Sequence, residues 1–540
     1  MVSLPMTLKR LSVILFCMLT SLFAAEAQTI NAASCNESDV AAALSGITAD
    51  GTTVGVPPGN CTWTTSLSYA QVHSFTLQGA GAISGTGSQS TISGTGTDST
   101  IIRDNINRSG GDSPLLKIST ISGKSFRMTG IAFTYSSSNM TVTGNGSIVI
   151  DGQSTQVRID HDHFNQINNV DLRLGGGIQG VVDHCQFDAG FNDENQMRFS
   201  DENWNGDAEG LGNGSWNDTS HFGTSQFMFA ENNNFQWATG GAGEGGPHAF
   251  AFDIGIGGGR GVFRYNAVGY HVALQTHGTS GGTQDYRGMR AAEVYQNTFV
   301  WSSNPTADQF AFLVQLEGGA SLWWGNSITG FNQFLHLYIA RVSNATYGET
   351  APPAGWGYCG TAQTGSASGW DGNTSSSGYP CVDGIGRGKG DLLQGTFSTK
   401  CNETLDCTSY KGQWPNQILE PLYSWENTFN AVPQEPDHYS VNASGLVLSE
   451  NKDYYLQLPN YDESASFNGT AGIGQGLLSV RPSTCTASVG YWATDQKTLY
   501  LCGSGNTWNS YYSPYTYPHP LVASSVTSPM PPTDLLAVPK

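Results

Sequence analysis

The sequence predicts an all-β solenoid in which each coil is built from three short strands joined by turns. Two patterns predict it: a phrase that recurs about every 30 residues, and a column of apolar residues at a fixed place in that phrase. The composition agrees, because 68 of the 540 residues are glycine and only 12% are charged. Such a composition is typical of strands and turns rather than of helical bundles.

The recurring phrase places asparagine two residues before an apolar residue, as in "FAENNNF", "FRYNAV", "VYQNTF" and "LWWGNSI". Asn233, Asn266, Asn297 and Asn326 are 33, 31 and 29 residues apart, and Asp162 and Cys185 occupy the same slot in earlier coils. We expect this slot to lie at a turn, where stacked amides bond to one another and to the backbone as an asparagine ladder.

An apolar column lies three residues before the asparagine slot and should point into the solenoid. Its members are Met128, Ile159, Val182, Ala230, Phe263, Val294 and Trp323. Long amphipathic runs, which helical repeats need, are missing from this part of the sequence.

These phrases resemble the right-handed parallel β-helix of the pectate lyase superfamily, from about residue 60 to 345 with one more coil near "LYSWENTF". The segment "SDVAAALSGITADGTTVGVPPGNCTW" resembles the start of such proteins, where a short helix caps the first coil. The superfamily includes lyases, hydrolases, epimerases and binding proteins, so the resemblance implies a fold more strongly than a function.

The expected organisation has six parts. They are a signal peptide at 1–27, an N-terminal cap at 28–66, the parallel β-helix at 67–345, a disulfide-stapled insertion at 346–420, a last coil at 421–450, and a C-terminal cap and tail at 451–540.

The first 27 residues predict a cleaved secretion signal, with Lys9 and Arg10 before the apolar "LSVILF" and Ala25-Glu26-Ala27 at the end. A membrane-spanning helix is the alternative, but the apolar run falls short of about 20 residues. We therefore expect an extracellular or periplasmic protein without a membrane span.

The net charge limits the classes of partner that we expect. Without residues 1–27 the chain keeps 21 basic and 42 acidic side chains, a net charge near −21. This charge excludes nucleic acid as an expected partner. A polysaccharide partner and a monomeric state are expected instead.

Cysteine spacing agrees with export. Apart from Cys17 in the signal, we expect four local disulfides, with Cys185 left over. The expected pairs are Cys35–Cys61, Cys359–Cys381, Cys401–Cys407 and Cys485–Cys502.

In the lyases that the chain resembles, the strand before the asparagine-slot strand lines the substrate groove. The corresponding segments include "SIVIDG", "VDLRLGG", "AFDIGIGG", "VALQTHG", "FLVQLEGG" and "FLHLYIA". Side chains alternate across a strand. If Ile148, Leu172, Ile254, Leu274, Val314 and Leu337 face inward, the outward set is Asp151, Asp171, Arg173, Asp253, Gln275, His277, Gln315, Glu317, His336 and Tyr338.

A second outward column lies two residues before the asparagine slot: Asp160, Asp183, Glu231, Arg264, Tyr295, Trp324 and Trp425. It is either a structural charge ladder or a second groove, and we favour the ladder. Asp160-His161 and Asp183-His184 are expected to help build turns.

Cleavage of a uronic-acid polymer by β-elimination needs a base, a cation against the carboxylate and help for the leaving oxygen. No lysine occurs between Lys124 and Lys389. We therefore assign the catalytic roles to histidine and arginine: His277, Arg173, Arg287 and Arg290. Gln275, Glu317, His336 and Tyr338, with Trp204 and Trp216 of the acidic insertion 192–221, are expected to bind substrate.

The resemblance to lyases also implies Ca²⁺, for which Asp151, Asp171 and Asp253 are the candidate ligands. Two other functions stay open. A β-helix hydrolase would use Asp253 and Glu317 as acid and base, and a non-catalytic surface protein would bind carbohydrate without cleaving it.

Overall fold

A computed structural model describes residues 28–88, 90, 92–108, 113–135, 146–165, 169–189, 193–200, 221–237, 249–254, 259–269, 272–276, 289–300, 312–331, 333–338, 385, 387–389, 418–430, 432–433, 439–442, 450–457 and 467–523. The signal segment and the cysteines at 359, 381, 401 and 407 lie outside these residues.

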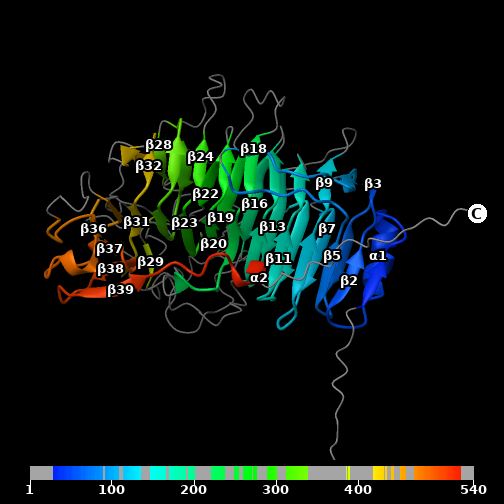
Figure 1. Ribbon diagram of the computed structural model, residues 1–540, viewed down its shortest axis with the longest axis horizontal. Helices are drawn as coiled ribbons and strands as arrows, with labels where there is room; N and C mark the ends of the chain where they lie inside the picture. Colours follow the sequence, from blue (N-terminus) through cyan, green and yellow to red (C-terminus); the bar gives the residue numbers. More distant parts are fainter. Residues whose placement is uncertain are drawn as a thin grey trace, which may run out of the picture.

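The chain folds as a right-handed parallel β-helix, as the sequence predicted (Figure 1). Successive strands visit three long sheets in turn, and each strand pairs in parallel with the equivalent strand of the next coil, as β11 does with β14. We call the sheets A, B and C; the chain runs from C to A to B in each coil.

Sheet A contains β1 (Thr29–Asn31), β2 (Thr52–Gly55), β5 (Phe75–Gln78), β8 (Phe126–Thr129), β11 (Val157–Asp160), β14 (Gly180–Asp183), β17 (Met228–Glu231), β20 (Arg260–Arg264), β23 (Ala291–Tyr295), β26 (Ala320–Trp324), β31 (Leu422–Trp425) and β35 (Tyr454–Leu456). Sheet B contains β3 (Gly59–Trp63), β6 (Thr100–Asp104), β9 (Ala132–Tyr135), β12 (His163–Asn165), β15 (Gln186–Ala189), β18 (Asn234–Trp237), β21 (Ala267–Gly269), β24 (Thr298–Val300), β27 (Ser327–Thr329), β32 (Thr428–Phe429) and β33 (Val432–Pro433).

Sheet C contains β4 (Leu67–Ala70), β7 (Leu116–Thr120), β10 (Ile148–Gly152), β13 (Asn169–Gly175), β16 (Asp193–Ser200), β19 (Ala249–Ile254), β22 (Val272–Thr276), β25 (Phe312–Leu316), β28 (Gln333–Tyr338) and β34 (Tyr439–Asn442). Other elements are α1 (Glu37–Ser45), β29 (Arg387–Lys389) with β30 (Ile418–Leu419), a 3-10 turn (Leu478–Val480), the small sheet β36 (Ile473–Gly476), β37 (Gly490–Ala493), β38 (Thr498–Cys502) and β39 (Trp508–Tyr512), and α2 (Pro520–Ala523).

The interior of the solenoid is an apolar column from each sheet. The residues that the sequence placed inward on sheet C are all buried in one core, and so is the column three residues before the asparagine slot. Neighbouring coils stack like on like, as in the parallel rings of Phe164, Phe187 and Phe235, whose centroids are 4.6 Å apart at each step. Burial of this column is the main favourable contribution to folding.

The asparagine ladder lies at the turn from sheet A to sheet B, as predicted. The Oδ1 atom of each asparagine accepts the backbone N–H of the equivalent residue one coil earlier: Asn266 from Asn233 at 3.0 Å and Asn297 from Asn266 at 2.9 Å. Cys185 donates its N–H to Asn233, and Asp162 accepts from Ile131, so both occupy slots of the same ladder.

The residue before each ladder slot has a left-handed backbone. His161, His184, Asn232, Tyr265 and Gln296 have φ between 54° and 58°. This conformation is uncommon outside glycine, and here it turns the chain sharply so that the next residue points inward while the left-handed residue points outward.

Two of the predicted disulfides, Cys35–Cys61 and Cys485–Cys502, are confirmed, and Cys185 is a free, buried thiol as expected. The first disulfide ties the segment before α1 to the first strand of sheet B, and the second joins the region before β37 to β38.

The three sheets also contain strands from before residue 67 and from after residue 345. β1, β2 and β3 precede residue 67, and β31, β32 and β34 follow the 346–420 segment. The chain then leaves the last coil, forms the sheet β36 to β39 and runs back along the solenoid to α2 (Figure 1). We call residues 511–523 the tail segment.

The tail segment covers the outer face of sheet A. Arg264 donates to the carbonyls of Tyr515 and Thr516, both at 2.8 Å, and Glu231 accepts the N–H of His519 at 2.8 Å. The second outward column of the sequence analysis is therefore buried beneath this segment and the small sheet, with Asp160, Asp183, Glu231 and Arg264 all fully inaccessible. This burial agrees with a structural ladder of charges rather than a groove.

A strap formed by residues 79–98 crosses the outer face of sheet B. The N–H of Gly85 donates to the carbonyl of His184, and the N–H of Gly87 donates to Oδ1 of Asn234. At the far end of the strap, Asp98 contacts His163 of β12 at 2.8 Å. Burial opposes the charge of His163, but Asp188 and Asp98 raise its pKa to about 9.

We predict that Asn297→Ala destabilises the fold by about 3 kcal/mol, because it leaves the buried N–H of Asn266 without its acceptor and removes the donor to the Phe263 carbonyl. Urea unfolding of both proteins measures the change. Asn60→Ala is the control, since Asn60 is an exposed strand residue with a side-chain bond to Arg103, and its loss should cost less than about 0.5 kcal/mol. Equal effects of the two substitutions would contradict the ladder's role.

We also predict a pH-dependent loss of stability from Glu293 beneath the tail segment. Burial raises its pKa to about 7, against hydrogen bonds from Gly223 and Tyr512 that lower it. The folded carboxyl keeps its proton up to about pH 7, whereas the unfolded one releases it near pH 4.5, so stability falls as pH rises through this window.

Glu293→Gln should remove this slope and reduce the loss of unfolding free energy between pH 5 and pH 8 by about 2 kcal/mol. Urea unfolding at a series of pH values measures it. Parallel curves for the two proteins would show that Glu293 does not hold its proton in the folded state.

Candidate functional site

The outer face of sheet C carries a column of mostly polar residues in register. Cα pairing places these residues side by side on consecutive strands: Lys117, Val149, Arg173, Arg198, Asp253, Gln275, Gln315 and His336. Their neighbours in sequence point into the core, as Leu172 and Leu174 do on either side of Arg173. Alternation along a strand therefore directs this column outward.

Two ion pairs fix part of the column, and they differ in burial. Lys117 Nζ lies 2.7 Å from Asp151, with side chains 39% and 27% exposed. Arg198 Nε lies 2.9 Å from Asp253, where the carboxylate is fully buried and the guanidinium is 15% exposed. The second pair is therefore held much more firmly than the first.

Arg173 and Arg198 are register partners on β13 and β16, so two arginines stand on adjacent strands about 4.8 Å apart. Arg173 is buried to 8% exposure. Arg198 is paired with Asp253, and Arg173 adds a second cation on the adjacent strand of a strongly acidic chain. Arginine side chains are suited to binding carboxylates.

Arg198 was missed by the sequence analysis, which treated the whole of 192–221 as an acidic insertion outside the strands of the solenoid. That expectation is wrong for its first part, because Asp193–Ser200 forms β16 inside sheet C. The alternation of Met197, Arg198 and Phe199 is the signal of a half-buried strand, and the many acidic residues around it obscured that signal.

Several predicted site residues lie at the other end of sheet C. Gln275 belongs to the column, and Glu317 follows β25, donating its N–H to the carbonyl of Thr276. His336 is in the column on β28, and the backbone of Tyr338 ends that strand. Burial lowers the pKa of His336, so its imidazole is neutral near pH 7 and able to accept a proton.

Four predicted residues, His277, Arg287, Trp204 and Trp216, lie outside the described residues. Arg290 lies apart from the column, directly before β23, where the chain enters sheet A. Its N–H donates to the carbonyl of Gly259, and the residue is 2% exposed. The structure thus brings together Arg173, Asp253, Gln275 and His336 on one face, and sets Arg290 at the edge of sheet A.

The three candidate calcium ligands do not fit a common site. Asp151 is paired with Lys117, Asp253 is paired with Arg198, and Asp171 is a fully buried residue two positions before Arg173. Within the described ranges, no group of three or more His, Cys, Asp or Glu side chains is placed to hold a metal ion. We therefore route no step of a mechanism through calcium at these residues.

Comparisons with known proteins add little to this geometry. No protein-family model and no curated protein matches the sequence. One similar structure is ORF18 of Geobacillus virus E2, 8% identical with a TM-score of 0.28, covering 89% of this chain and 86% of that chain. Another is the catalytic domain of a GH87 α-1,3-glucanase in complex with tetrasaccharides, 9% identical with a TM-score of 0.26, covering 80% and 68%.

Both similarities are too distant to bear on function. In the part of the chain that the structure describes, no helix is long and apolar enough to cross a membrane.

We predict that the two ion pairs of sheet C differ in their contribution to stability. Arg198→Gln should destabilise the protein by about 3 kcal/mol, because it removes the cation beside a fully buried carboxylate. Lys117→Gln, in the exposed pair, is the matched control and should cost less than about 1 kcal/mol. Thermal and urea unfolding measure both, and a negligible effect of Arg198→Gln would show that the polar column is not held as described.

Proposed function

We propose that the protein is a secreted polysaccharide lyase that binds a uronic-acid-containing polysaccharide along the outer face of sheet C and cleaves it by β-elimination. The observation that carries this proposal is the pair Arg173 and Arg198 on adjacent strands, in a chain with a net charge of −20. An acidic protein repels a polyanion unless cations are concentrated where it binds.

In β-elimination a base removes the proton on the carbon next to the sugar carboxylate. The electrons of that C–H bond form a carbon–carbon double bond as the glycosidic C–O bond breaks, and the departing oxygen takes up a proton. A guanidinium bound to the carboxylate stabilises the charge that develops on it. In this proposal Arg173 takes that role, and Arg198, which is paired with Asp253, lies on the adjacent strand.

The base is a histidine in this proposal. His277 is the sequence-based candidate, since it comes directly after β22 (Val272–Thr276) in the sequence. His336 of β28 is also compatible with a histidine base, because burial lowers the pKa of its imidazole and keeps the ring neutral. Neutral imidazole accepts a proton near neutral pH, whereas arginine does so only in a strongly altered environment.

Secretion is part of the proposal. Two disulfides link cysteines that lie close in sequence, and such bonds persist in oxidising compartments. The apolar N-terminal segment supports the same location.

The alternative hydrolase pair finds less support. Asp253 is in register with Gln275 and Gln315, and Glu317 lies two residues beyond Gln315. Two strand spacings and two residues along the strand put the Cα atoms of Asp253 and Glu317 about 12 Å apart. The Asp253 carboxylate is also fully buried and bound to Arg198 at 2.9 Å, which disfavours it as an acid or base acting on a substrate.

The direct test incubates the purified mature chain with pectate, alginate and other uronans, with and without a chelator, and follows the ultraviolet absorbance of the unsaturated uronide product. The lyase proposal predicts that absorbance. New reducing ends from neutral glycans without it would instead identify a hydrolase, and binding without either product would identify a non-catalytic protein.

We predict that Arg173→Ala lowers kcat/KM at least about 100-fold with the fold intact, because it removes a cation that stabilises developing charge. His277→Ala should cost a factor on the order of 100 to 10,000 if it is the base. The control is Arg103→Ala, which removes an outward arginine of sheet B bonded to Asn60. An unchanged kcat/KM in Arg173→Ala would show that Arg173 takes no part in catalysis.

A further inference from the structure

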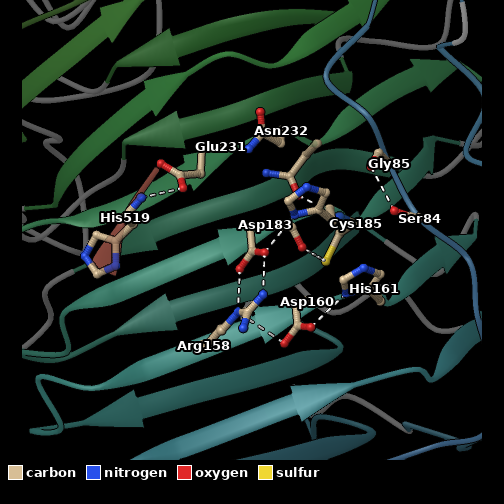
Figure 2. A network of polar contacts seen from close by, with 12 residues as sticks. Ser84, Gly85, Arg158, Asp160, His161, Asp183, Cys185, Glu231, Asn232 and His519 are labelled. Atoms are coloured by element: carbon tan, nitrogen blue, oxygen red, sulfur yellow. Dashed lines mark hydrogen bonds and ion pairs between the residues drawn. The ribbon is translucent and has the colours of Figure 1, made fainter. Parts of the chain in front are cut away.

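Two histidines are stacked on the edge where sheet A turns into sheet B, away from sheet C. The rings of His161 and His184 have centroids 5.4 Å apart and planes 5° apart. They come from consecutive coils, and their side chains are 38% and 30% exposed. Figure 2 shows His161 beside Asp160, with Asp183 and Cys185 of the next coil above it.

The backbone imposes this stacking. Both histidines occupy the left-handed position before a ladder slot, with φ of 56° and 54°. Behind them, Asp162 and Cys185 point inward as members of the ladder. Consecutive coils therefore present the two imidazoles in the same direction, one coil apart, on a rigid edge.

Each ring is oriented by a buried carboxylate. His161 Nδ1 lies 2.8 Å from Asp160 Oδ2, and His184 Nδ1 lies 2.8 Å from Asp183 Oδ2. A carboxylate accepts only, so the neutral ring carries its proton on Nδ1 and leaves a lone pair on Nε2. Among the contacts of the described residues, neither Nε2 has a hydrogen-bond partner.

The carboxylates are themselves fixed by arginines. Arg127 donates to both oxygens of Asp160 at 2.7 Å. Arg158 donates to both oxygens of Asp183 at 2.9 and 2.8 Å, as Figure 2 shows. Both aspartates are fully inaccessible. Carboxylate-to-Nδ1 bonds of this kind fix the tautomer and raise the basicity of imidazole when Nε2 binds a metal.

We propose that His161 and His184 form a surface site for a divalent first-row transition ion, Zn²⁺, Ni²⁺ or Cu²⁺, with the two Nε2 atoms as its protein ligands. Imidazole nitrogen suits these ions, whereas Ca²⁺ and Mg²⁺ take oxygen ligands. Asp160 and Asp183 are already bound to Nδ1 of the two rings, and among the described residues no group of three His, Cys, Asp or Glu side chains is placed to hold an ion together, so water completes the coordination. The site is thus open to a further ligand.

Binding needs a small movement of the rings. Two nitrogens on one ion at about 2.0–2.1 Å stand roughly 3 to 3.4 Å apart, which is closer than the 5.4 Å between the ring centroids. Because the ring planes are only 5° apart, the two Nε2 lone pairs point in the same direction, so each ring must tilt out of the stack toward the other before both lone pairs meet at one ion. Partly exposed side chains undergo such rotations readily.

The two sides of the pair are bordered by segments from distant parts of the chain. On the sheet B side, Gly85 of the strap bonds to the carbonyl of His184. On the sheet A side, the hydroxyl of Tyr517 in the tail segment bonds to Asn232, the next residue in the left-handed column. These borders make the pair a defined feature of the surface, separate from the polar column of sheet C.

The test is calorimetric titration of Zn²⁺, Ni²⁺ and Cu²⁺ into the mature chain, prepared without a histidine tag and stripped with a chelator. The substitutions are His161→Asn and His184→Asn, because Asn232 shows that asparagine fits this turn position with φ of 58°. We expect one ion per chain in the wild type and at least about ten-fold weaker binding in each variant.

His73→Asn is the matched control, since His73 is a partly exposed histidine 3.6 Å from Asp50 with no stacked imidazole. It should bind as tightly as the wild type. Equal affinity in wild type and both His161 and His184 variants would overturn the site, as would an affinity that drops equally in the control.

A second readout needs no variant. The electron paramagnetic resonance spectrum of the wild-type chain with one equivalent of Cu²⁺ should show hyperfine splitting from two equivalent imidazole nitrogens. A spectrum with one nitrogen, or with oxygen ligands alone, would contradict a shared ion. Neither measurement depends on polysaccharide cleavage, so the site and the proposed function can fail separately.

Discussion

The register between coils is the constraint on which the rest of the structure depends, and the buried asparagine ladder sets it. Each ladder side chain accepts the N–H of the previous coil, so a slip of one residue would leave several buried amides without partners at about 1–3 kcal/mol each. With register fixed, residues at equivalent positions stand in columns. The apolar core, the polar column of sheet C and the stacked histidines are all consequences.

The three outer faces then differ in what covers them. On sheet A the charged column lies beneath the tail segment, where Arg264 and Glu231 bond to its backbone. On sheet B the strap crosses the strands, and its Asp98 contacts His163 of β12, which also contacts Asp188. Sheet C keeps a column with cations at Lys117, Arg173 and Arg198, and for that reason we place the proposed carbohydrate site there.

Local repetition explains what the sequence could predict. The asparagine period, the inward apolar residues and two disulfides depend on short spacings, and all three are confirmed. The contacts that cover Arg158 and Arg264 come from residues more than 250 positions away, which no local pattern reveals. Arg198 was missed because acidic neighbours resembled a loop, and the pairing of His161 with His184 required the left-handed turn positions to be known.

The central claim is that polysaccharide binds to sheet C and not to sheet A or sheet B. Amide hydrogen exchange of the mature chain, with and without a saturating uronan oligosaccharide, tests it most directly. The account predicts slower exchange in Asn169–Gly175, Asp193–Ser200, Ala249–Ile254 and Val272–Thr276, with no change in the strands of sheets A and B. Slower exchange confined to sheet A, sheet B or the turn between them would contradict it.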